Sequence, residues 1–334
     1  MAKVKAALFY NYPSELEGEV FGQGRHDRIA ALTDLYPNVV HAGNFDEHAG
    51  RLSDIEVIFA TWGIPVFTPE QFAKMPKLKA VFYAAGNVKA FAQGLLDRDI
   101  ILVSAWAVNA IPPSELCLSQ ILLSLRGYFR TVRQYKEMKS FDAKKFWRPG
   151  VMDETVGLIG LGFIGARVRE LLRPFPLKVI AHDPFLTPER AKALDVESAS
   201  LADVFKRAHV VSNHIPDLPE TRGVLDAKLF KTLREGATFI NTGRGAQVVE
   251  ADMIAMLKAR PDVTALLDVT APEPPEANSD LWRLPNVVIS PHIGGTVGHE
   301  VVRLADCVIE EFQAWAAGKP LRYQVTKDVF KTMG

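Results

Sequence analysis

Short apolar segments rich in β-branched residues alternate with amphipathic segments along almost the whole chain. The apolar runs have the length and bounding turn residues of strands, and the segments between them repeat apolar positions at helical spacing. This alternation is typical of α/β proteins with parallel sheets. Strands are predicted at Val4–Tyr10, Val39–Ala42, Val57–Ala60, Ala80–Ala84, Ile100–Ser104, Thr155–Ile159, Val179–His182, Val210–His214, Thr238–Asn241, Thr264–Asp268 and Val287–Ser290.

Among the helical patterns, the longest begins at Pro112 and is predicted to run as one helix to Met138. Proline suits a first helical turn, and regularly spaced leucines follow it. A charged, aromatic loop is expected over Lys139–Glu154. Further helices are predicted over Val248–Ala259 and Glu300–Ala317.

The apolar run Thr155–Ile159 ends in a glycine motif, Gly160-x-Gly162-x-x-Gly165. In a dinucleotide-binding turn the first glycine permits the tight strand-to-helix connection, the second admits the pyrophosphate and the third allows close helix packing. Phe163 and Ile164 would open the helix, whose unpaired N–H groups and positive dipole end favour phosphate. Glycines also mark ordinary turns, but the strand before and the helix after this motif favour a dinucleotide site.

Asp183 ends the next apolar run, eighteen residues after Gly165. A carboxylate at this place can accept hydrogen bonds from both hydroxyls of the adenosine ribose, and it would repel a 2′-phosphate. No arginine immediately follows it. The predicted cofactor is therefore NAD rather than NADP.

Three ionisable residues follow strands of this same region: Arg244, Glu273 and His292. Open α/β sheets bind ligands beyond the carboxyl ends of their strands, so these side chains are expected at one edge, near the glycine turn. Each one alone has an ordinary explanation as a polar loop residue. Together they match the reduction of a 2-keto acid. Arginine can hold the carboxylate, histidine can exchange a proton, and glutamate can orient the imidazole and favour its charged form.

Size and composition limit the classes of protein to which the chain can belong. The chain has 334 residues, 48% of them hydrophobic and 23% charged, with 39 basic and 39 acidic side chains. Two domains of a globular protein are expected, and the balanced charge suggests neither a nucleic-acid nor a membrane partner. Cys117 and Cys307 lie in apolar helical patterns and are expected to be buried free thiols, which fits a reducing cytoplasm. No histidine grouping has metal-ligand spacing, and no metal is expected.

The chain resembles the D-isomer-specific 2-hydroxyacid dehydrogenase family, which includes phosphoglycerate, glycerate and D-lactate dehydrogenases. The similarity covers nearly all of it. The segments that carry the resemblance are Gly160–Gly165 with Asp183, Asn213–Pro216 with Glu220 and Thr221, Gly236–Gly245, Leu267–Pro274 and Pro291–Gly295.

The resemblance implies specific roles for residues of these motifs. Arg244 would anchor the substrate, His292 would be the acid/base and Glu273 its partner, and Asp268 would bind the nicotinamide carboxamide. Substrate would be contacted by Ala85, Gly86, Asn87, Arg244 and His292. Cofactor contacts would come from Gly160, Gly162, Phe163, Ile164, Gly165, Asp183, His214, Pro216, Thr221, Thr242, Gly243, Asp268, Gly294 and Gly295.

The resemblance also implies the architecture. Two Rossmann-like, doubly wound parallel-sheet domains would enclose the active site in a cleft. A discontinuous substrate-binding domain would comprise residues 1–106 and 299–334, and the NAD-binding domain residues 107–298. The helix from Pro112 onward commonly serves dimerisation in such proteins, so a homodimer is expected.

Two departures from the family pattern bear on the substrate. Ala60–Gly63, at the tip of a strand where several phosphate-handling relatives carry arginine, contains no cation. In addition, the family's Gly-x-Asp-Asn turn is replaced by Ala84-Ala-Gly-Asn87, which keeps backbone donors but lacks the aspartate. Small unphosphorylated 2-keto acids are therefore the predicted substrates. Lys89 is the one nearby basic residue, expected at the start of a helix, and Trp62 and Tyr83 either line an apolar pocket or pack in the core.

Two alternatives remain open at the level of sequence. An NAD-sensing binding protein, like the C-terminal-binding corepressors of the same fold, would keep the same three ionisable residues. Formate oxidation on the same scaffold needs no carbonyl acid–base pair and would make Glu273 hard to explain. The substrate side chain and the physiological direction are not determined by the sequence.

Overall fold

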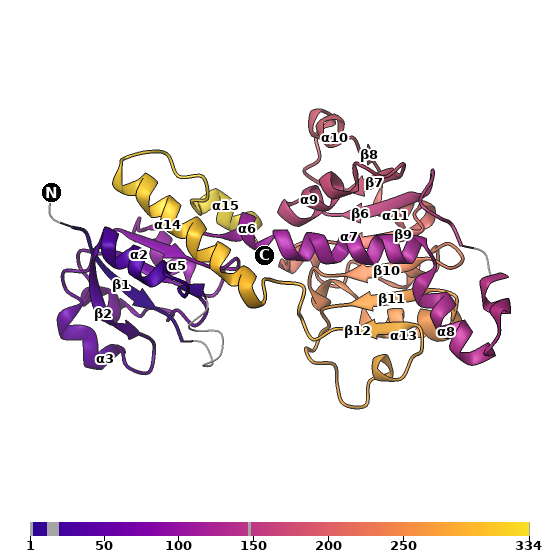
Figure 1. Ribbon diagram of the computed structural model, residues 1–334, viewed down its shortest axis with the longest axis horizontal. Coiled ribbons are helices and arrows are strands. Elements are labelled where there is room, and N and C mark those ends of the chain that lie inside the picture. The colour runs from indigo at the N-terminus through magenta and orange to yellow at the C-terminus, as the bar shows by residue number, and fades with distance from the viewer. Residues whose placement is uncertain (1–2, 12–19, 146–147, 334) are drawn as a thin grey trace. The chain divides into compact units, whose positions relative to one another are not determined.

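The computed structural model describes residues 3–11, 20–145 and 148–333, so residues 146–147 of the expected loop lie outside the described part. The chain divides into two compact units (Figure 1). Unit 1 comprises Met1–Asn109 and Thr296–Gly334, and unit 2 comprises Ala110–Gly295. The chain thus enters and leaves unit 2 once each.

Unit 1 is built on a five-stranded parallel sheet in the order β2-β1-β3-β4-β5. Its inner strands are buried on both faces and therefore read as continuous apolar runs. The edge strand β2 tolerates Pro37, because its outer side forms no ladder. The strands are β1 (Lys5–Phe9), β2 (Asp34–Val40), β3 (Val57–Ala60), β4 (Ala80–Tyr83) and β5 (Ile101–Ser104).

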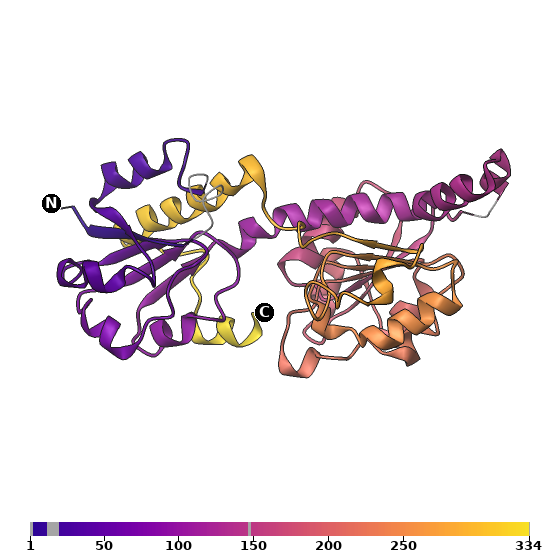
Figure 2. The same ribbon diagram turned by 90° about the horizontal axis from the view of Figure 1, so that it is seen from below.

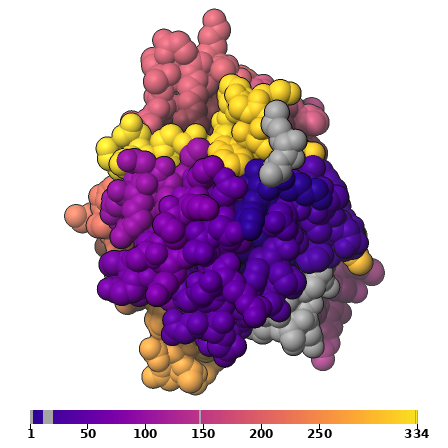
Figure 3. Space-filling model, turned by 90° about the vertical axis from the view of Figure 1, so that its left-hand side faces the viewer, coloured from indigo at the N-terminus to yellow at the C-terminus, as the bar shows by residue number. Residues whose placement is uncertain are grey.

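Helices cover both faces of this sheet. On one face α14, which comes from the C-terminal part of the chain, packs beside α2. Phe312 of α14 contacts Phe59 and Phe82 of the sheet at ring-centroid distances of 5.1 and 5.6 Å. Figure 3 shows the yellow C-terminal segment bordering the indigo N-terminal one. The helices of unit 1 are α2 (Arg25–Leu32), α3 (Phe45–His48), α4 (Pro69–Ala73), α5 (Ala92–Leu96), α6 (Trp106–Asn109), α14 (Val302–Ala316) and α15 (Lys327–Thr332).

Unit 2 is built on a seven-stranded parallel sheet in the order β12-β11-β10-β9-β6-β7-β8. The chain begins at β6, builds outward to β8 and then returns to β9 on the other side. This is the doubly wound arrangement, and its switch point lies between β6 and β9. The strands are β6 (Thr155–Ile159), β7 (Lys178–His182), β8 (Glu197–Ser198), β9 (Val210–Asn213), β10 (Thr238–Asn241), β11 (Thr264–Leu267) and β12 (Val287–Ile289).

Two helical layers sandwich the sheet of unit 2 (Figure 2). Apolar side chains of α7 and α9 form the core on one face, and those of α11, α12 and α13 form it on the other. The helices of this unit are α7 (Ile111–Leu125), α8 (Tyr128–Met138), α9 (Phe163–Leu172), α10 (Pro188–Leu194), α11 (Leu201–Arg207), α12 (Ala227–Phe230) and α13 (Glu250–Ala259).

The predicted single helix from Pro112 to Met138 is wrong. Gly127 interrupts it with a left-handed backbone (φ 63°) and divides it into α7 and α8. Apolar residues at helical spacing, Phe129, Val132 and Tyr135, follow this position, so the period alone does not reveal the break. Glycine is the residue that adopts such a conformation without steric cost.

Other element boundaries differ at the edges of the two sheets. Strand β2 begins five residues before the expected Val39, and the short edge strand β8 and helix α15 were not expected. The last long helix begins at Val302, after a 3₁₀ turn over Gly298–Val301. None of the described helices combines the length and apolar composition that a membrane crossing requires.

Candidate active site

The glycine turn after β6 has the geometry that a close strand-to-helix connection needs. Gly160 has a left-handed backbone (φ 86°). A Cβ atom on Gly165 would lie 2.0 Å from the carbonyl oxygen of Gly160, so only glycine lets α9 pack this close to the turn. At both positions a larger residue would be strained or would collide with backbone.

The amino end of α9 is open to a ligand. Its N-cap, Gly162, provides no side-chain cap, and nothing lies within 4 Å of where a Cβ of Gly162 would be. Phe163 follows with 58% of its surface exposed. Because a helix of ten residues has unpaired N–H groups and a positive dipole end here, the turn fits the pyrophosphate of a dinucleotide.

Asp183, directly after β7, is held beside this turn by two backbone donors. Its Oδ2 accepts from the N–H of Leu161 at 2.7 Å, and its Oδ1 accepts from the N–H of Phe185 at 2.8 Å. An ionised carboxylate has about four acceptor sites, so acceptor capacity remains for ribose hydroxyls. The sequence-predicted Asp183 and glycine turn are thus brought together.

His214 lies beneath the turn, against Gly165. Within the described structure neither ring nitrogen has a hydrogen-bond partner, and burial lowers the pKa of His214 to about 4. A neutral imidazole therefore packs here at physiological pH.

Two threonines of the expected cofactor set already have partners within the protein. The hydroxyl of Thr221 donates to the carbonyl of Pro216, in the same loop, at 2.7 Å. The hydroxyl of Thr242 lies 3.1 Å from the buried thiol of Cys117.

A buried network of three amide side chains joins the carboxyl ends of β9 and β10. The side-chain nitrogen of Asn213 donates to Asn241 Oδ1 at 3.0 Å and to Gln247 Oε1 at 2.8 Å. Gln247 Nε2 in turn donates to the carbonyl of Ile215 at 2.9 Å. Buried amides need such partners, because an unpaired polar group inside a protein is costly.

This amide network positions Arg244. Gln247 Oε1 accepts from the backbone N–H of Arg244 at 3.0 Å, and Asn241 Nδ2 donates to its carbonyl at 3.0 Å. The half-buried guanidinium donates to the carbonyl of Gly243, and no carboxylate pairs with it within the described residues. Its charge therefore remains available to an anionic substrate. Sequence reasoning missed Gln247, although a glutamine three residues after Arg244 was visible.

His292 and Glu273 meet at this edge of the sheet. His292 Nδ1 lies 2.5 Å from Glu273 Oε1, and both side chains are partly exposed. Glu273 follows β11 and His292 follows β12, which are neighbours in the sheet. Since Nδ1 is bonded to the carboxylate, Nε2 is the ring nitrogen left for a substrate.

Asp268 organises the segment that carries His292. Its Oδ1 accepts from the Ser290 hydroxyl at 2.6 Å and from the N–H of Ile293 at 2.9 Å, while its Oδ2 accepts from the N–H of Gly294 at 2.8 Å. Its backbone carbonyl accepts from the N–H of His292 at 3.1 Å. The buried carboxylate is thus a support for the histidine loop, and Ser290 is a partner that sequence reasoning did not identify.

In unit 1, the loop after β4 contains the expected substrate residues Ala85, Gly86 and Asn87. The hydroxyl of Ser104 donates to the carbonyls of Ala85 and Gly86 at 2.7 and 2.8 Å. The hydroxyl of Thr61 donates to the carbonyl of Ala84 at 3.0 Å. The backbone N–H groups of residues 85–87 have no acceptor within the described part of the chain, so they can serve an anion.

For the neighbouring Lys89 the expectation changes, and for Tyr83 the structure decides between two open alternatives. Lys89 does not open a helix: it precedes α5, and its ammonium donates to the carbonyl of Phe330 in α15 at 2.6 Å and lies over the Phe330 ring. Tyr83 is 5% exposed and packs against Phe91, so it belongs to the core and burial raises its pKa. Trp62 is half-buried and packs beside the apolar clusters on both faces of the sheet.

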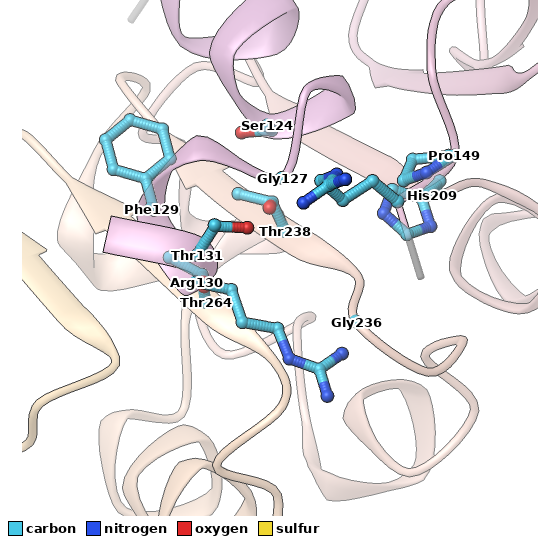
Figure 4. A pocket seen from close by; sticks show the side chains of 11 residues that line it. Ser124, Gly127, Phe129, Arg130, Thr131, Pro149, His209, Gly236, Thr238 and Thr264 are labelled. Atoms are coloured by element: carbon cyan, nitrogen blue, oxygen red, sulfur yellow. The ribbon is translucent and has the colours of Figure 1, made fainter. Parts of the chain in front are cut away.

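A small cavity at the opposite edge of the unit 2 sheet was not anticipated (Figure 4). Arg130, His209 and Gly236 contribute to its lining, and it has a volume of about 20 Å³. Such a volume holds no more than a single water molecule. The cavity is therefore no substrate site. Among the described residues, no group of His, Cys, Asp or Glu side chains could hold a metal ion.

A strand–glycine turn–helix with an acid on the next strand defines unit 2 as a dinucleotide-binding domain. Residues 118–294 match the family described as D-isomer specific 2-hydroxyacid dehydrogenase, NAD binding domain. The chain belongs to this family, and NAD is the cofactor of its binding domain.

Individual relatives show the extent of the similarity. YoaD of Bacillus subtilis (strain 168), a protein named as a candidate 2-hydroxyacid dehydrogenase, is 30% identical over 279 residues, which cover 80% of this chain and 79% of YoaD. D-3-phosphoglycerate dehydrogenase of Archaeoglobus fulgidus is 31% identical over 229 residues, 69% of this chain. The match spans only 43% of the length of that relative.

A solved structure supports the fold over nearly the whole chain. D-lactate dehydrogenase with NAD⁺ from Lactobacillus jensenii superposes with a TM-score of 0.75 at 21% identity. The match covers 97% of this chain and 100% of that one. At this identity the likeness bears on the fold, and the two α/β units agree with it.

Proposed function

We propose that the protein is an NAD-dependent D-2-hydroxyacid dehydrogenase that acts as a reductase of small, unphosphorylated 2-keto acids. The observation that carries the proposal is the contact between His292 Nδ1 and Glu273 Oε1, at the edge of the sheet where Arg244 is also held. An acid/base, its orienting carboxylate and an unpaired cation are the groups that this reaction needs.

Each residue has a distinct task in the proposed reaction. Arg244 binds the substrate carboxylate through its planar fork, and the backbone N–H groups of residues 85–87 supply further donors. His292 donates its Nε2 proton to the carbonyl oxygen, which becomes the hydroxyl of the product. NADH, when bound, supplies the hydride for the carbonyl carbon. Glu273 keeps the imidazole oriented through its contact with Nδ1.

The preference for an unphosphorylated substrate rests on the cations of unit 1. A buried phosphate needs cationic partners or several backbone donors. Ala60–Gly63, at the tip of β3, carries no cation, and the ammonium of Lys89 is already bound to the carbonyl of Phe330. In this proposal Arg244 binds the substrate carboxylate. Of the two cations compared, Lys89 and Arg244, neither is therefore left to bind a phosphate.

The test is a panel of 2-keto acids with NADH, followed by absorbance. Glyoxylate, hydroxypyruvate and short aliphatic 2-keto acids are expected to be reduced at ordinary enzyme rates, faster than phosphohydroxypyruvate. A clear preference for phosphohydroxypyruvate would show that the substrate pocket is wrongly assigned. If no 2-keto acid is reduced although NADH binds, the corepressor-type alternative would replace the enzyme. That alternative gains no support from the relatives compared above.

The proposed enzyme is a homodimer of the kind expected from the resemblance. Support comes from exposed apolar side chains along α7 and α8, where Leu123, Tyr128, Tyr135 and Met138 are 38–50% exposed. Large apolar side chains gathered on a surface favour a protein partner. Sedimentation of the full chain would measure the oligomeric state, and a monomer at assay concentration would contradict it.

A further inference from the structure

Arg190 lies on α10, seven residues after Asp183 in the sequence. Its side chain contacts the dinucleotide turn. Its Nη2 donates a short hydrogen bond to the carbonyl of Leu161, in the turn between Gly160 and Gly162. The N–H of the same Leu161 donates to Asp183 Oδ2 at 2.7 Å. One residue of the turn therefore links the cation to the carboxylate, and the two charged groups lie within roughly 9 Å of each other.

Among the residues that the structure describes, no acidic side chain neutralises the charge of Arg190. Its side chain is exposed, and within the described residues it contacts the Leu161 carbonyl but pairs with no carboxylate. A guanidinium has five N–H donors, so most of them remain available after the bond to Leu161. Planar donors of this kind suit a phosphate group.

The position of Arg190 relative to a dinucleotide follows from the turn itself. The pyrophosphate lies at the amino end of the helix, and the acid after the second strand receives the adenosine ribose hydroxyls. A 2′-phosphate would therefore lie beside Asp183, next to the turn residue Leu161 that Arg190 also contacts. Asp183 would repel it, whereas Arg190 would attract it.

We propose that Asp183 and Arg190 form an opposed pair that decides between NAD(H) and NADP(H). In the natural protein the carboxylate binds the ribose hydroxyls and excludes the phosphate. Arg190 is a specificity-determining residue that becomes a 2′-phosphate ligand once the carboxylate is removed. The proposal concerns cofactor binding alone, so it stands or falls separately from the proposed substrate.

The test measures dissociation constants of NADH and NADPH for the full chain without substrate, by calorimetry. The natural protein is expected to bind NADH at least about tenfold more tightly than NADPH. Asp183→Ser is expected to tighten NADPH binding on the order of tenfold, because the repulsion is lost and Arg190 gains a phosphate partner. In Asp183→Ser/Arg190→Gln the gain should disappear.

Matched controls separate a local contact from a change in net charge or folding. Lys192→Gln removes one positive charge from the same helix, and in the Asp183→Ser background it should leave the gain in NADPH affinity intact. Asp183→Asn retains a side-chain acceptor for the turn and replaces Asp183→Ser if that variant melts early. The proposal is overturned if the folded Asp183 variants gain no NADPH affinity. It is equally overturned if the gain survives Arg190→Gln or is lost with Lys192→Gln.

Discussion

The carboxyl edge of the unit 2 sheet presents ionisable side chains, whereas the corresponding edge of unit 1 presents backbone groups. In unit 2, Arg244, Glu273 and His292 follow adjacent strands. In unit 1, the loops after β3 and β4 contain no charged side chain over Ala60–Gly63 or Ala84–Asn87. Both edges belong to parallel sheets with helices on both faces, so architecture alone does not explain the difference.

The way each edge is supported shows what the difference means. In unit 2, buried polar side chains such as Gln247 and Asp268 hold the segments that carry Arg244 and His292. In unit 1, the hydroxyls of Thr61 and Ser104 bind the loop carbonyls and leave its N–H groups available. Chemistry that moves protons needs ionisable groups held in position, while binding a carboxylate needs only donors. We therefore expect mutations in unit 2 to affect kcat and those in unit 1 to affect mainly KM.

The largest effect is expected from His292→Ala. Without the acid/base, kcat for 2-keto acid reduction should fall by about 10²- to 10⁴-fold. NADH affinity should change little, because the imidazole serves the substrate carbonyl. Steady-state kinetics and calorimetric NADH binding measure both quantities. A variant that keeps more than a tenth of the natural kcat would contradict the role of His292.

A smaller effect is expected from Gln247→Leu. The substitution removes one hydrogen-bond partner from each of three groups: the side-chain amide of Asn213, which keeps its bond to Asn241, the N–H of Arg244 and the carbonyl of Ile215. The free energy of unfolding should fall by about 2–3 kcal/mol. Because Arg244 is displaced, kcat for the keto acid should fall and its KM should rise. Urea titration measures the free energy of unfolding, and steady-state kinetics measure the constants for the keto acid.

The comparison variant in unit 1 is Ser104→Ala. It removes one hydroxyl that serves the carbonyls of Ala85 and Gly86. The free energy of unfolding should fall by about 1 kcal/mol. The KM for the keto acid should rise, and the NADH affinity should be unchanged. If Ser104→Ala lowered kcat as strongly as Gln247→Leu does, the assigned division of labour between the two edges would be wrong.

Glu273→Gln should lower kcat for 2-keto acid reduction, but less than His292→Ala does. The variant keeps the imidazole of His292 and replaces the carboxylate that contacts its Nδ1 by an amide, so the ring is oriented less firmly. NADH affinity should change little. Steady-state kinetics that give the natural kcat would argue against the pairing.

The smallest effect concerns stability in acid. Burial lowers the pKa values of His209 and His214 to about 4, from 6.5 in the unfolded chain. The unfolded chain therefore binds more protons, and the free energy of unfolding should fall as pH decreases from 6.5 towards 4. Each histidine contributes about 1–2 kcal/mol by pH 5. In denaturant titrations, His209→Gln should lose less stability between pH 7 and pH 5, whereas exposed His299→Gln should behave like the natural protein.

Local pattern determined the elements and the candidate chemistry. Most strands of both sheets coincide with short apolar runs, because a strand buried on both faces must be apolar throughout. The glycine turn and Asp183 could be predicted for a related reason. Steric limits at Gly160 and Gly165 and the distance to the next strand are expressed within one short segment.

The tertiary structure alone decided which distant groups support that chemistry. Four features depend on packing between separate elements. They are the helix break at Gly127, the hydrogen bond from Lys89 to Phe330, the amide network of Gln247 and the hydrogen bond from Arg190 to Leu161. Hydrophobic periodicity carries no information about these contacts. A polar side chain takes its partner from whatever the fold brings within hydrogen-bonding distance, and that is settled only when the layers are packed.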